Sequence, residues 1–251
     1  MRYSIKIKFL VFFLAIFAGN VSAQRYPSKQ ISSNHGLPSD QIEAVFKDSR
    51  GILWIGTSNG LSKIENGVAL NFYNKDGIAH NNSWDILEDE NNNIWIASYG
   101  GGITKFDGKK FTVFNEEKGL VNNFVRKLCV FEKQVFIGTQ DGISILNTKN
   151  DSISTIKTNA FAIHDIGAQN FQVMDFFTHK NELYLGTFRH GIFKIDSKNN
   201  ALKKVFDFKS NLDALFSIYK NDSILYYGID GATTDLIKGA FKKFKIEKLL
   251  N

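Results

Sequence analysis

Residues that could bind a ligand gather in the short polar stretches between the apolar segments of this chain. They combine planar amides with aromatic rings and a few charged groups. Aromatic platforms beside amides suit a neutral, hydroxyl-rich ligand such as a sugar, and the same residue types are also typical of plain turns. The candidate ligand-binding residues are Asn59, Trp84, Tyr99, Gln140, Asp141, Phe188, Arg189 and His190. Further polar loop residues that extend the set are Ser58, Asn81, Asn82, Asn122 and Asn123.

Catalytic motifs are missing from the sequence. It has no Gly-x-Ser-x-Gly elbow, no His-Glu-x-x-His and no phosphate loop. Glycoside hydrolysis needs two carboxyl groups about 5–10 Å apart. Nothing in the spacing selects a pair from the loop aspartates, for which turn capping is the simpler explanation: Asp40, Asp141, Asp165 and Asp230. We therefore expect no catalytic residue and no cofactor.

Metal ligands are not expected either. The five histidines are scattered singly and are interpreted as solvated loop residues: His35, His80, His164, His179 and His190. Residues 89–93 superficially resemble a calcium loop, but Ile94 stands where the sharp glycine turn belongs and no glutamate follows at the bidentate position. The segment aligns with the turn at residues 48–51, so we interpret it as a hairpin turn.

The elements that position these loops are copies of one unit. The phrase Trp-Ile-Gly-Thr at residues 54–57 recurs in altered form at 95–98, 136–139 and 184–187, with a decayed copy at 226–229. A period of 41 to 48 residues means that one supersecondary unit is repeated along the chain. The units are approximately 36–76, 77–118, 119–160, 161–207 and 208–251.

Each unit is predicted to contain four short strands. In the first unit, apolar or alternating runs at 41–47, 52–55, 61–64 and 68–73 are separated by turn signals, among them an Asp-x-x-Gly turn and Asn66-Gly67. The fifth unit supplies its third strand at 236–237 and its fourth strand at 241–246. Four antiparallel strands in 40–50 residues predict an all-β fold, a β-propeller of four-stranded antiparallel blades with about five repeats.

The same residues resemble the two-component regulator propeller repeat. Gly36-Leu37-Pro38-Ser39-Asp40, Asp48-Ser49-Arg50-Gly51 and Trp54-Ile55-Gly56-Thr57 through Gly60-Leu61 carry the resemblance, which extends over residues 30–246. It implies an extracytoplasmic sensor region of the kind found ahead of a membrane span and a histidine kinase, often one that detects oligosaccharides. This sequence has no such span or kinase after the repeats, so those activities are not carried over.

The N-terminus carries a secretory signal pattern. Basic residues precede an apolar run at 9–17, and Val21-Ser22-Ala23 is a small-residue cleavage site. We predict a signal peptide at 1–23, a mature propeller domain at 24–251 and a periplasmic or secreted location, without stable membrane insertion after cleavage. Cys129 is the single cysteine and is interpreted as a small buried hydrophobe. The formal charge of +6 is spread out, so no nucleic-acid partner is expected.

Ring closure is less regular in this sequence than in a complete propeller. Residues 29–33 sit where the family places the outer strand of the last blade, yet the fifth unit has a fourth strand of its own. The hypotheses are a truncated propeller, one completed by blades of another propeller or sensor chain, or a loosely closed five-bladed ring.

Three classes of function follow from this reading. The first is a non-catalytic sensory propeller that binds an oligosaccharide or another small ligand. The second is a secreted enzyme, a glycosidase or lyase, that uses the mouth of the channel. The third is a protein–protein scaffold. Stacked aromatic rings with amides would favour the sensor, and clustered acids with a histidine would favour the enzyme.

Overall fold

The computed structural model describes residues 30–156, 171–207, 214–221, 224–230 and 240–245. The contacts within the chain divide it into two units, Met1–Ile31 and Ser32–Asn251, and every sheet lies in the second unit. The predicted cleavage site after Ala23 lies outside the described residues.

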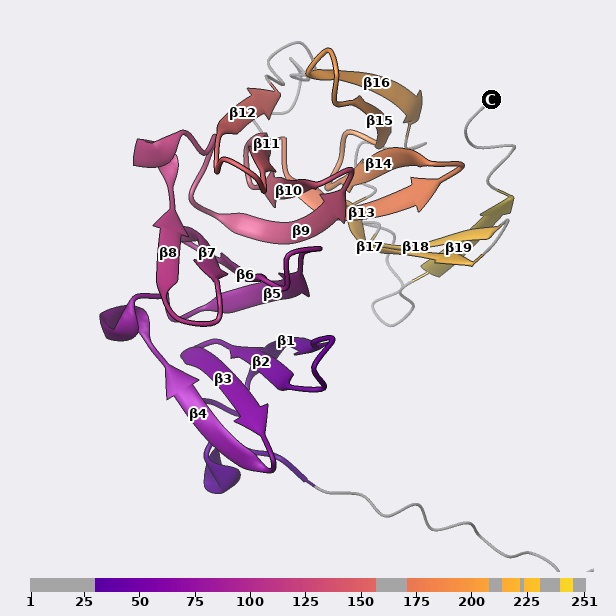
Figure 1. The fold of residues 1–251 in the computed structure, drawn as a ribbon. Helices are drawn as coiled ribbons and strands as arrows, with labels where there is room; N and C mark the ends of the chain where they lie inside the picture. Colours follow the sequence, from indigo (N-terminus) through magenta and orange to yellow (C-terminus); the bar gives the residue numbers. More distant parts are fainter. Residues whose placement is uncertain (1–29, 157–170, 208–213, 222–223, 231–239, 246–251) are drawn as a thin grey trace, which may run out of the picture. The chain divides into compact units, whose positions relative to one another are not determined.

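The second unit is built from antiparallel sheets that follow one another along the chain (Figure 1). The first four sheets have four strands each, in sequence order, as the repeat predicts. Their strands are β1 (Ile42–Lys47), β2 (Leu53–Thr57), β3 (Gly60–Glu65) and β4 (Val68–Phe72); β5 (Ser83–Glu88), β6 (Ile94–Ser98), β7 (Gly102–Phe106) and β8 (Phe111–Phe114); β9 (Val125–Phe131), β10 (Gln134–Thr139), β11 (Gly142–Asn147) and β12 (Ile153–Ile156); and β13 (Val173–His179), β14 (Glu182–Thr187), β15 (Ile192–Asp196) and β16 (Ala201–Phe206).

The fifth sheet departs from the prediction. It contains β17 (Ala214–Asn221), β18 (Ile224–Asp230) and β19 (Ala240–Lys245). The segment 241–246 was expected as an outer fourth strand, but β19 pairs directly with β18 and is the third strand of its sheet. The pairing runs from Ile224 opposite Lys245 to Ile229 opposite Ala240, so the long strand forms a full ladder with β18. The sequence at 236–237, expected as the third strand, lies outside the described residues.

The N-terminal boundary of the repeats also differs from the expectation. Residues 29–33 were expected to form an outer strand. Residues 30–32 have no strand conformation, and Ser33–His35 form the short 3-10 helix η1. Similar one-turn helices, η2 (Asn74–Asp76) and η3 (Glu116–Lys118), lie directly before the next two units. Each is followed by a glycine with a positive φ, so η1 precedes the first repeat in the same way as its counterparts.

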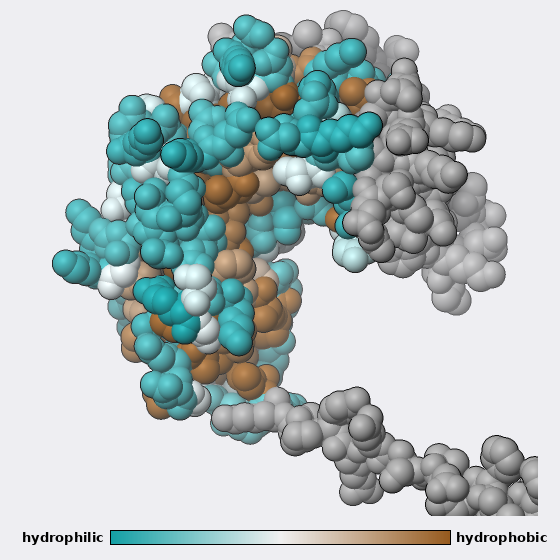
Figure 2. Space-filling model, turned by 45° about the vertical axis from the view of Figure 1, so that its right-hand side comes forward, coloured by the Kyte–Doolittle hydropathy of each residue, from teal (hydrophilic) through white to brown (hydrophobic). Residues whose placement is uncertain are grey.

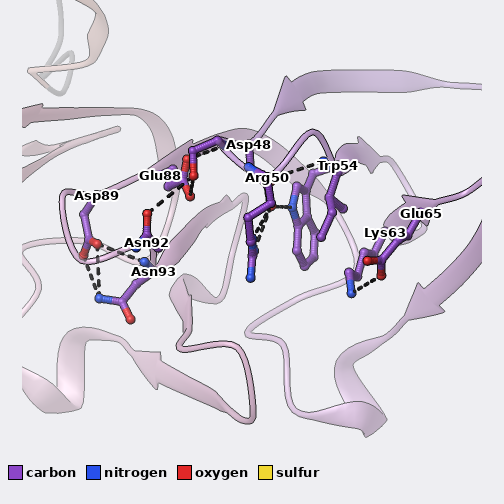
Figure 3. Close-up of polar contacts among 11 residues, drawn as sticks. Asp48, Arg50, Trp54, Lys63, Glu65, Glu88, Asp89, Asn92 and Asn93 are labelled. Carbon is purple, nitrogen blue, oxygen red and sulfur yellow. Dashed lines mark hydrogen bonds and ion pairs between the residues drawn. The ribbon is translucent and has the colours of Figure 1, made fainter.

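An aspartate in the first hairpin turn anchors the tryptophan of the repeated phrase. The Asp48 carboxylate accepts hydrogen bonds from the Trp54 indole Nε1–H at 3.1 Å and from the backbone N–H of Ile52 at 2.9 Å. It also forms an ion pair with Arg50 at 2.7 Å (Figure 3). Trp54 has no exposed surface, so its N–H needs this partner.

The second blade repeats this arrangement at residues 89–95. The Asp89 carboxylate accepts hydrogen bonds from the Trp95 Nε1–H at 2.8 Å and from the backbone N–H of Asn93 at 2.9 Å. Figure 3 shows Asn93 beside Asp89 in this turn. The hairpin-turn interpretation of residues 89–93 is therefore confirmed, because the carboxylate holds its own turn and a buried indole.

In the third and fourth blades, both the turn and the aromatic residue differ from those of the first two blades. Phe136 replaces the tryptophan in the third blade and follows a tight turn at Glu132 and Lys133. Its ring has no N–H to donate. In the fourth blade, the Tyr184 hydroxyl donates to Glu182 at 2.6 Å. The polar partner is thus present where the aromatic residue has a donor and missing where it has none.

Successive blades pack through their apolar faces. One core cluster joins Trp54 and Leu61 of the first blade to Ile86 and Ile96 of the second. Gly56 allows this approach, since a Cβ atom there would lie 2.4 Å from the backbone oxygen of Ser83 on β5. Its φ is not positive, so close approach alone explains the glycine.

The first sheet also exposes apolar side chains. Ile42 and Val45 on β1 and Val68 and Leu70 on β4 are 41%, 64%, 70% and 56% exposed. Figure 2 shows apolar residues at the surface of the part of the molecule that carries this sheet. Within the residues that the structure describes, no helix has the length and apolar character needed to cross a membrane.

Candidate ligand-binding site

Two sets of loops meet at the same end of each blade. The loop after the second strand is hydrogen-bonded to the segment that leads into the first strand, as in Tyr99 N–H to the carbonyl of Asn82 at 3.1 Å and Gln140 N–H to the carbonyl of Phe124 at 2.9 Å. Ser58 and Phe188 form the equivalent bonds in the first and fourth blades. The predicted ligand-binding residues lie on these loops or on the strand ends beside them.

A β-bulge marks this end of the first strand in every sheet. The pairing register shifts at Glu43 on β1, Trp84 on β5, Arg126 on β9 and Met174 on β13, and again between Leu215 and Ser217 on β17. A bulge leaves its extra residue out of the ladder and redirects its side chain. Trp84 and Arg126 therefore occupy the same position of the repeat in adjacent blades.

Four side chains form an aromatic–arginine cluster between the second and third blades: Trp84, Tyr99, Phe124 and Arg126. The rings of Trp84 and Tyr99 are stacked, with centroids 4.6 Å apart and planes at 14°. Phe124 meets Tyr99 edge-on at 5.0 Å and is 40% exposed. The guanidinium carbon of Arg126 lies 4.7 Å from the Trp84 ring centroid and 5.9 Å from that of Tyr99.

Two nitrogen donors in this cluster lack a hydrogen-bond partner. The indole Nε1 of Trp84 and the Nε of Arg126 are both buried and unpaired. A buried donor without a partner costs about 1–3 kcal/mol. No carboxylate of the described residues forms an ion pair with Arg126. The cluster thus combines an apolar platform with unsatisfied donors.

The other predicted residues are distributed over neighbouring loops. Asn59 accepts a long hydrogen bond from the Asn81 amide at 3.4 Å, and Asp141 donates its backbone N–H to Thr139. Phe188 and Arg189 form a second ring–guanidinium pair, at 5.2 Å. Of the eight candidates, the structure brings only Trp84 and Tyr99 into the aromatic–arginine cluster.

His190 differs from the solvated loop histidine that was expected. Its side chain is 4% exposed, and its ring lies 5.3 Å from that of Phe171. Burial, together with the charge of Lys204, lowers the pKa of His190, although Asp207 opposes the shift. The imidazole is therefore held neutral within the blade.

Several polar loop residues are used to close the loops themselves. Asp40 accepts hydrogen bonds from the backbone N–H and hydroxyl of Ser33 at 2.6 and 2.8 Å, which lower its pKa. The Oδ1 atoms of Asn81 and Asn123 accept the equivalent backbone N–H groups in the next two blades. Turn capping is thus confirmed for Asp40. His164, Asp165 and the side chain of Asp230 lie outside the described residues.

The sequence reading missed Phe124 and Arg126. Arg126 could have been found by aligning the first strands of the blades, because it is the repeat equivalent of Trp84. It also missed a charged row next to the bulges, formed by Asp85, Lys127 and Asp175. Lys127 lies 3.3 Å from Asp85. The charge of Asp175 also raises the pKa values of Lys127 and Cys129.

The acids of this row tie neighbouring blades together. Asp85 accepts the backbone N–H of Leu128, and Asp175 accepts that of Ile218. Burial raises the pKa of both carboxyl groups, and these bonds and the charge of Lys127 offset the effect only in part. Among the described residues, no group of three or more histidine, cysteine or acidic side chains is arranged to hold a metal ion.

Burial also determines the character of Cys129 on β9. It raises the pKa of this thiol to about 11, and the carboxylates of Asp175 and Asp85 act in the same direction. The thiol is therefore protonated at neutral pH and is not a nucleophile. Cys129 was expected to be a small buried hydrophobe, and the structure leaves it only partly buried on its strand.

Comparison with known proteins identifies the repeat. Residues 36–59 and 77–100 match the family model of the two component regulator propeller. The chain carries two component regulator propeller repeats. Histidine kinase P4 of Formosa agariphila is 33% identical to this chain over 76 residues, which cover 27% of this chain and 6% of that protein.

Solved structures with the same fold come from Bacteroides thetaiotaomicron. The extracellular domain of the putative hybrid two component system BT3049 matches with a TM-score of 0.65 and 18% identity, covering 85% of this chain and 31% of that chain. The extracellular domain of BT4673 matches with a TM-score of 0.62 and 19% identity, covering 78% and 28%. This chain spans less than a third of either domain. The WD40 beta propeller domain of Doa1 matches with a TM-score of 0.53 and 17% identity, covering 71% of this chain and 57% of that chain, so these likenesses establish the β-propeller fold.

Proposed function

We propose that this chain is a non-catalytic, extracytoplasmic sensory propeller that binds an oligosaccharide at the aromatic–arginine cluster. The regulator propeller repeats and the extracellular domains of similar fold support a sensory role outside the cytoplasm. The observation that carries the ligand assignment is the stack of Trp84 on Tyr99, with Phe124 40% exposed beside it. A flat aromatic platform matches the apolar face of a sugar ring, and the unpaired donors match its oxygen atoms.

The absence of catalysis is supported by the roles of the perturbed acids. A catalytic carboxyl group with a raised pKa should face a substrate. Asp85 and Asp175 have raised pKa values, but each accepts a backbone N–H from the next blade at 2.9 and 2.8 Å. Their positions are those of structural ties, and the cluster itself contains no acid.

Export by the predicted signal peptide belongs to this proposal. Expression of the full chain in a Gram-negative host followed by cell fractionation and mass spectrometry tests it. The expected product is extracytoplasmic and begins at Gln24. An intact N-terminus in the cytoplasmic fraction would contradict it.

Tryptophan fluorescence can test ligand binding directly. Trp54 and Trp95 are fully buried and bonded to aspartates, whereas Trp84 is only partly buried. A ligand at the cluster should therefore change the emission of Trp84 alone. We expect an oligosaccharide panel to contain a ligand that shifts the emission and raises the melting temperature. Trp84→Phe should lose the fluorescence response, and Trp84→Ala should weaken binding at least tenfold.

The matched control for these variants is Tyr219→Phe, which lies on β17 of the fifth sheet and is 66% exposed. It should leave both readouts as in the wild-type chain. A panel of neutral and acidic oligosaccharides that produces neither an emission change nor a thermal shift would overturn the proposed function. Binding that survives Trp84→Ala unchanged would overturn the assignment of the site.

A further inference from the structure

The unpaired donors of the cluster constrain the chemistry of the ligand. Nε1 of Trp84 and Nε of Arg126 are buried without a hydrogen-bond partner. Both are donors only, because neither an indole N–H nor a guanidinium can accept a hydrogen bond. The group that satisfies them must therefore present acceptor oxygens, and a hydroxyl group is only one of several that can.

The charge around Arg126 distinguishes among these acceptors. Asp85 of the charged row is committed to Lys127 at 3.3 Å and to the backbone N–H of Leu128. Glu43, which holds the bulge position in the first blade, accepts a hydrogen bond from the Gln41 amide at 2.8 Å. None of the ion pairs among the described residues includes Arg126.

The repeat geometry explains why these groups converge. Trp84 and Arg126 are the bulge residues of adjacent first strands, so both side chains are redirected at the same end of neighbouring blades. The guanidinium carbon lies within 6 Å of two ring centroids, at 4.7 and 5.9 Å. A guanidinium held against aromatic rings keeps its charge and can bind an anion through its planar N–H groups.

We infer that the ligand is an acidic oligosaccharide, whose anionic oxygen group is bound by Arg126 and Trp84 while a ring packs against the exposed part of the platform. This inference rests on the proposed function and specifies a charged sugar, where the residue types alone suggested a neutral, hydroxyl-rich one. The shared chemistry is an anion with two or three equivalent oxygens. A carboxylate on a uronic acid and a sulfate ester both meet it.

Matched pairs of ligands separate the charge from the sugar. Oligogalacturonate is compared with its methyl ester, and a sulfated oligosaccharide with its desulfated form, by fluorescence titration and calorimetry. We expect at least one acid to bind ten times more tightly than its neutral partner, and that preference to fall as salt rises from 50 to 300 mM. The pair that shows the preference identifies the source of the anion.

Variants locate the preference on the protein. Arg126→Gln should lower the affinity for the acidic ligand at least tenfold and that for its neutral partner less than threefold. Lys109→Gln removes one positive charge from an exposed turn at the other end of the blade and should change neither. A melting curve of each variant verifies that it folds.

The outcomes separate this inference from the proposed function. Equal binding of acidic and neutral partners in the wild-type chain would overturn the inference and leave the sensory role intact. An acid preference that persists in Arg126→Gln would overturn the assignment to Arg126. Binding of none of the four ligands by the wild-type chain would overturn both.

Discussion

The carboxylate of Asp85 on β5 accepts a 2.9 Å hydrogen bond from the backbone N–H of Leu128 on β9. This bond ties the first strand of one blade to the first strand of the next. Asp175 repeats it two blades later with Ile218 at 2.8 Å. At the equivalent register position, opposite the second strand, the first, third and fifth blades have Ala44, Lys127 and Ser217. The tie is therefore a feature of alternate blades.

Removing this tie should destabilise the propeller strongly. Asp85→Ala leaves Lys127 and the N–H of buried Leu128 without their acceptor. Breaking a partly buried pair in this way costs about 2–4 kcal/mol. Urea unfolding at pH 7 should show a lower midpoint with an unchanged slope. The exposed pair of Lys63 and Glu65 supplies the control, since Glu65→Ala should cost less than about 1 kcal/mol.

The isosteric variant Asp85→Asn should reveal the ionisation of this group. The folded-state pKa of Asp85 is above its ordinary value of 3.8, so its favourable contribution to folding is present below pH 3.8 and is lost as the pH rises through the folded-state value. The stability of Asp85→Asn relative to the wild-type chain should therefore improve between pH 4 and pH 7. A relative stability that declines over this range would contradict the assigned burial.

The bond between Asp48 and Trp54 should behave as a coupled pair. Asp48→Ala leaves the buried Nε1–H of Trp54 and two backbone donors unpaired, at a cost of about 2–3 kcal/mol. In a Trp54→Phe background, the same change should cost about 1 kcal/mol less, because phenylalanine has no donor there. The third blade has this arrangement naturally, because Phe136 occupies the position of the tryptophan. A double-mutant cycle by urea unfolding measures the coupling, and purely additive effects would contradict it.

The same carboxylate should contribute to acid sensitivity. Burial alone would raise the pKa of Asp48, but hydrogen bonds from Arg50, Trp54 and Ile52 outweigh it and lower the value. A carboxyl group of this kind stabilises the fold above pH 3.8, and the contribution is lost as the pH falls through its folded-state pKa. The coupling energy between Asp48 and Trp54 should therefore become smaller as the pH falls below 3.8 and Asp48 is protonated.

The fold was largely predictable from the sequence, and the site was predictable only in part. The Trp-Ile-Gly-Thr phrase and its turns gave the four-stranded blade because period-2 runs and turn residues are local signals. The placement of β19 beside β18 depends on a pairing across residues 231–239, and the apolar pattern at 241–246 alone does not say which strand it pairs with. Trp84 and Tyr99 were recognised by residue type. Arg126 was not, because its role depends on a bulge and on the neighbouring blade. The burial of His190 likewise depends on Phe171 from another loop.

Replacing Gly56 by alanine tests whether the spacing between blades requires a glycine in the repeated phrase. At Gly56 a Cβ atom would lie 2.4 Å from the Ser83 carbonyl oxygen, and the backbone of the next blade cannot yield cheaply. Gly56→Ala should therefore destabilise the protein by about 2–4 kcal/mol. A Cβ atom at Gly108 would have no neighbouring atom within 4 Å, but the φ of this residue is +92°. Gly108→Ala should therefore cost only about 1–2 kcal/mol, from backbone strain. Thermal melting of both variants makes the comparison, and equal losses would show that blade spacing does not depend on Gly56.

His190 should make the fourth blade sensitive to mild acid. Burial and the charge of Lys204 lower its pKa, so the neutral imidazole is the form that packs on Phe171. A base whose folded-state pKa is depressed stabilises the fold fully above its ordinary value of 6.5, and the contribution is lost as the pH falls through the folded-state value. The wild-type chain should melt at a lower temperature at pH 5.5 than at pH 7.5. His190→Gln cannot take up this proton, so its melting temperature should change less between the two conditions. An equal decrease in both proteins would assign the sensitivity to other groups and contradict the burial of His190.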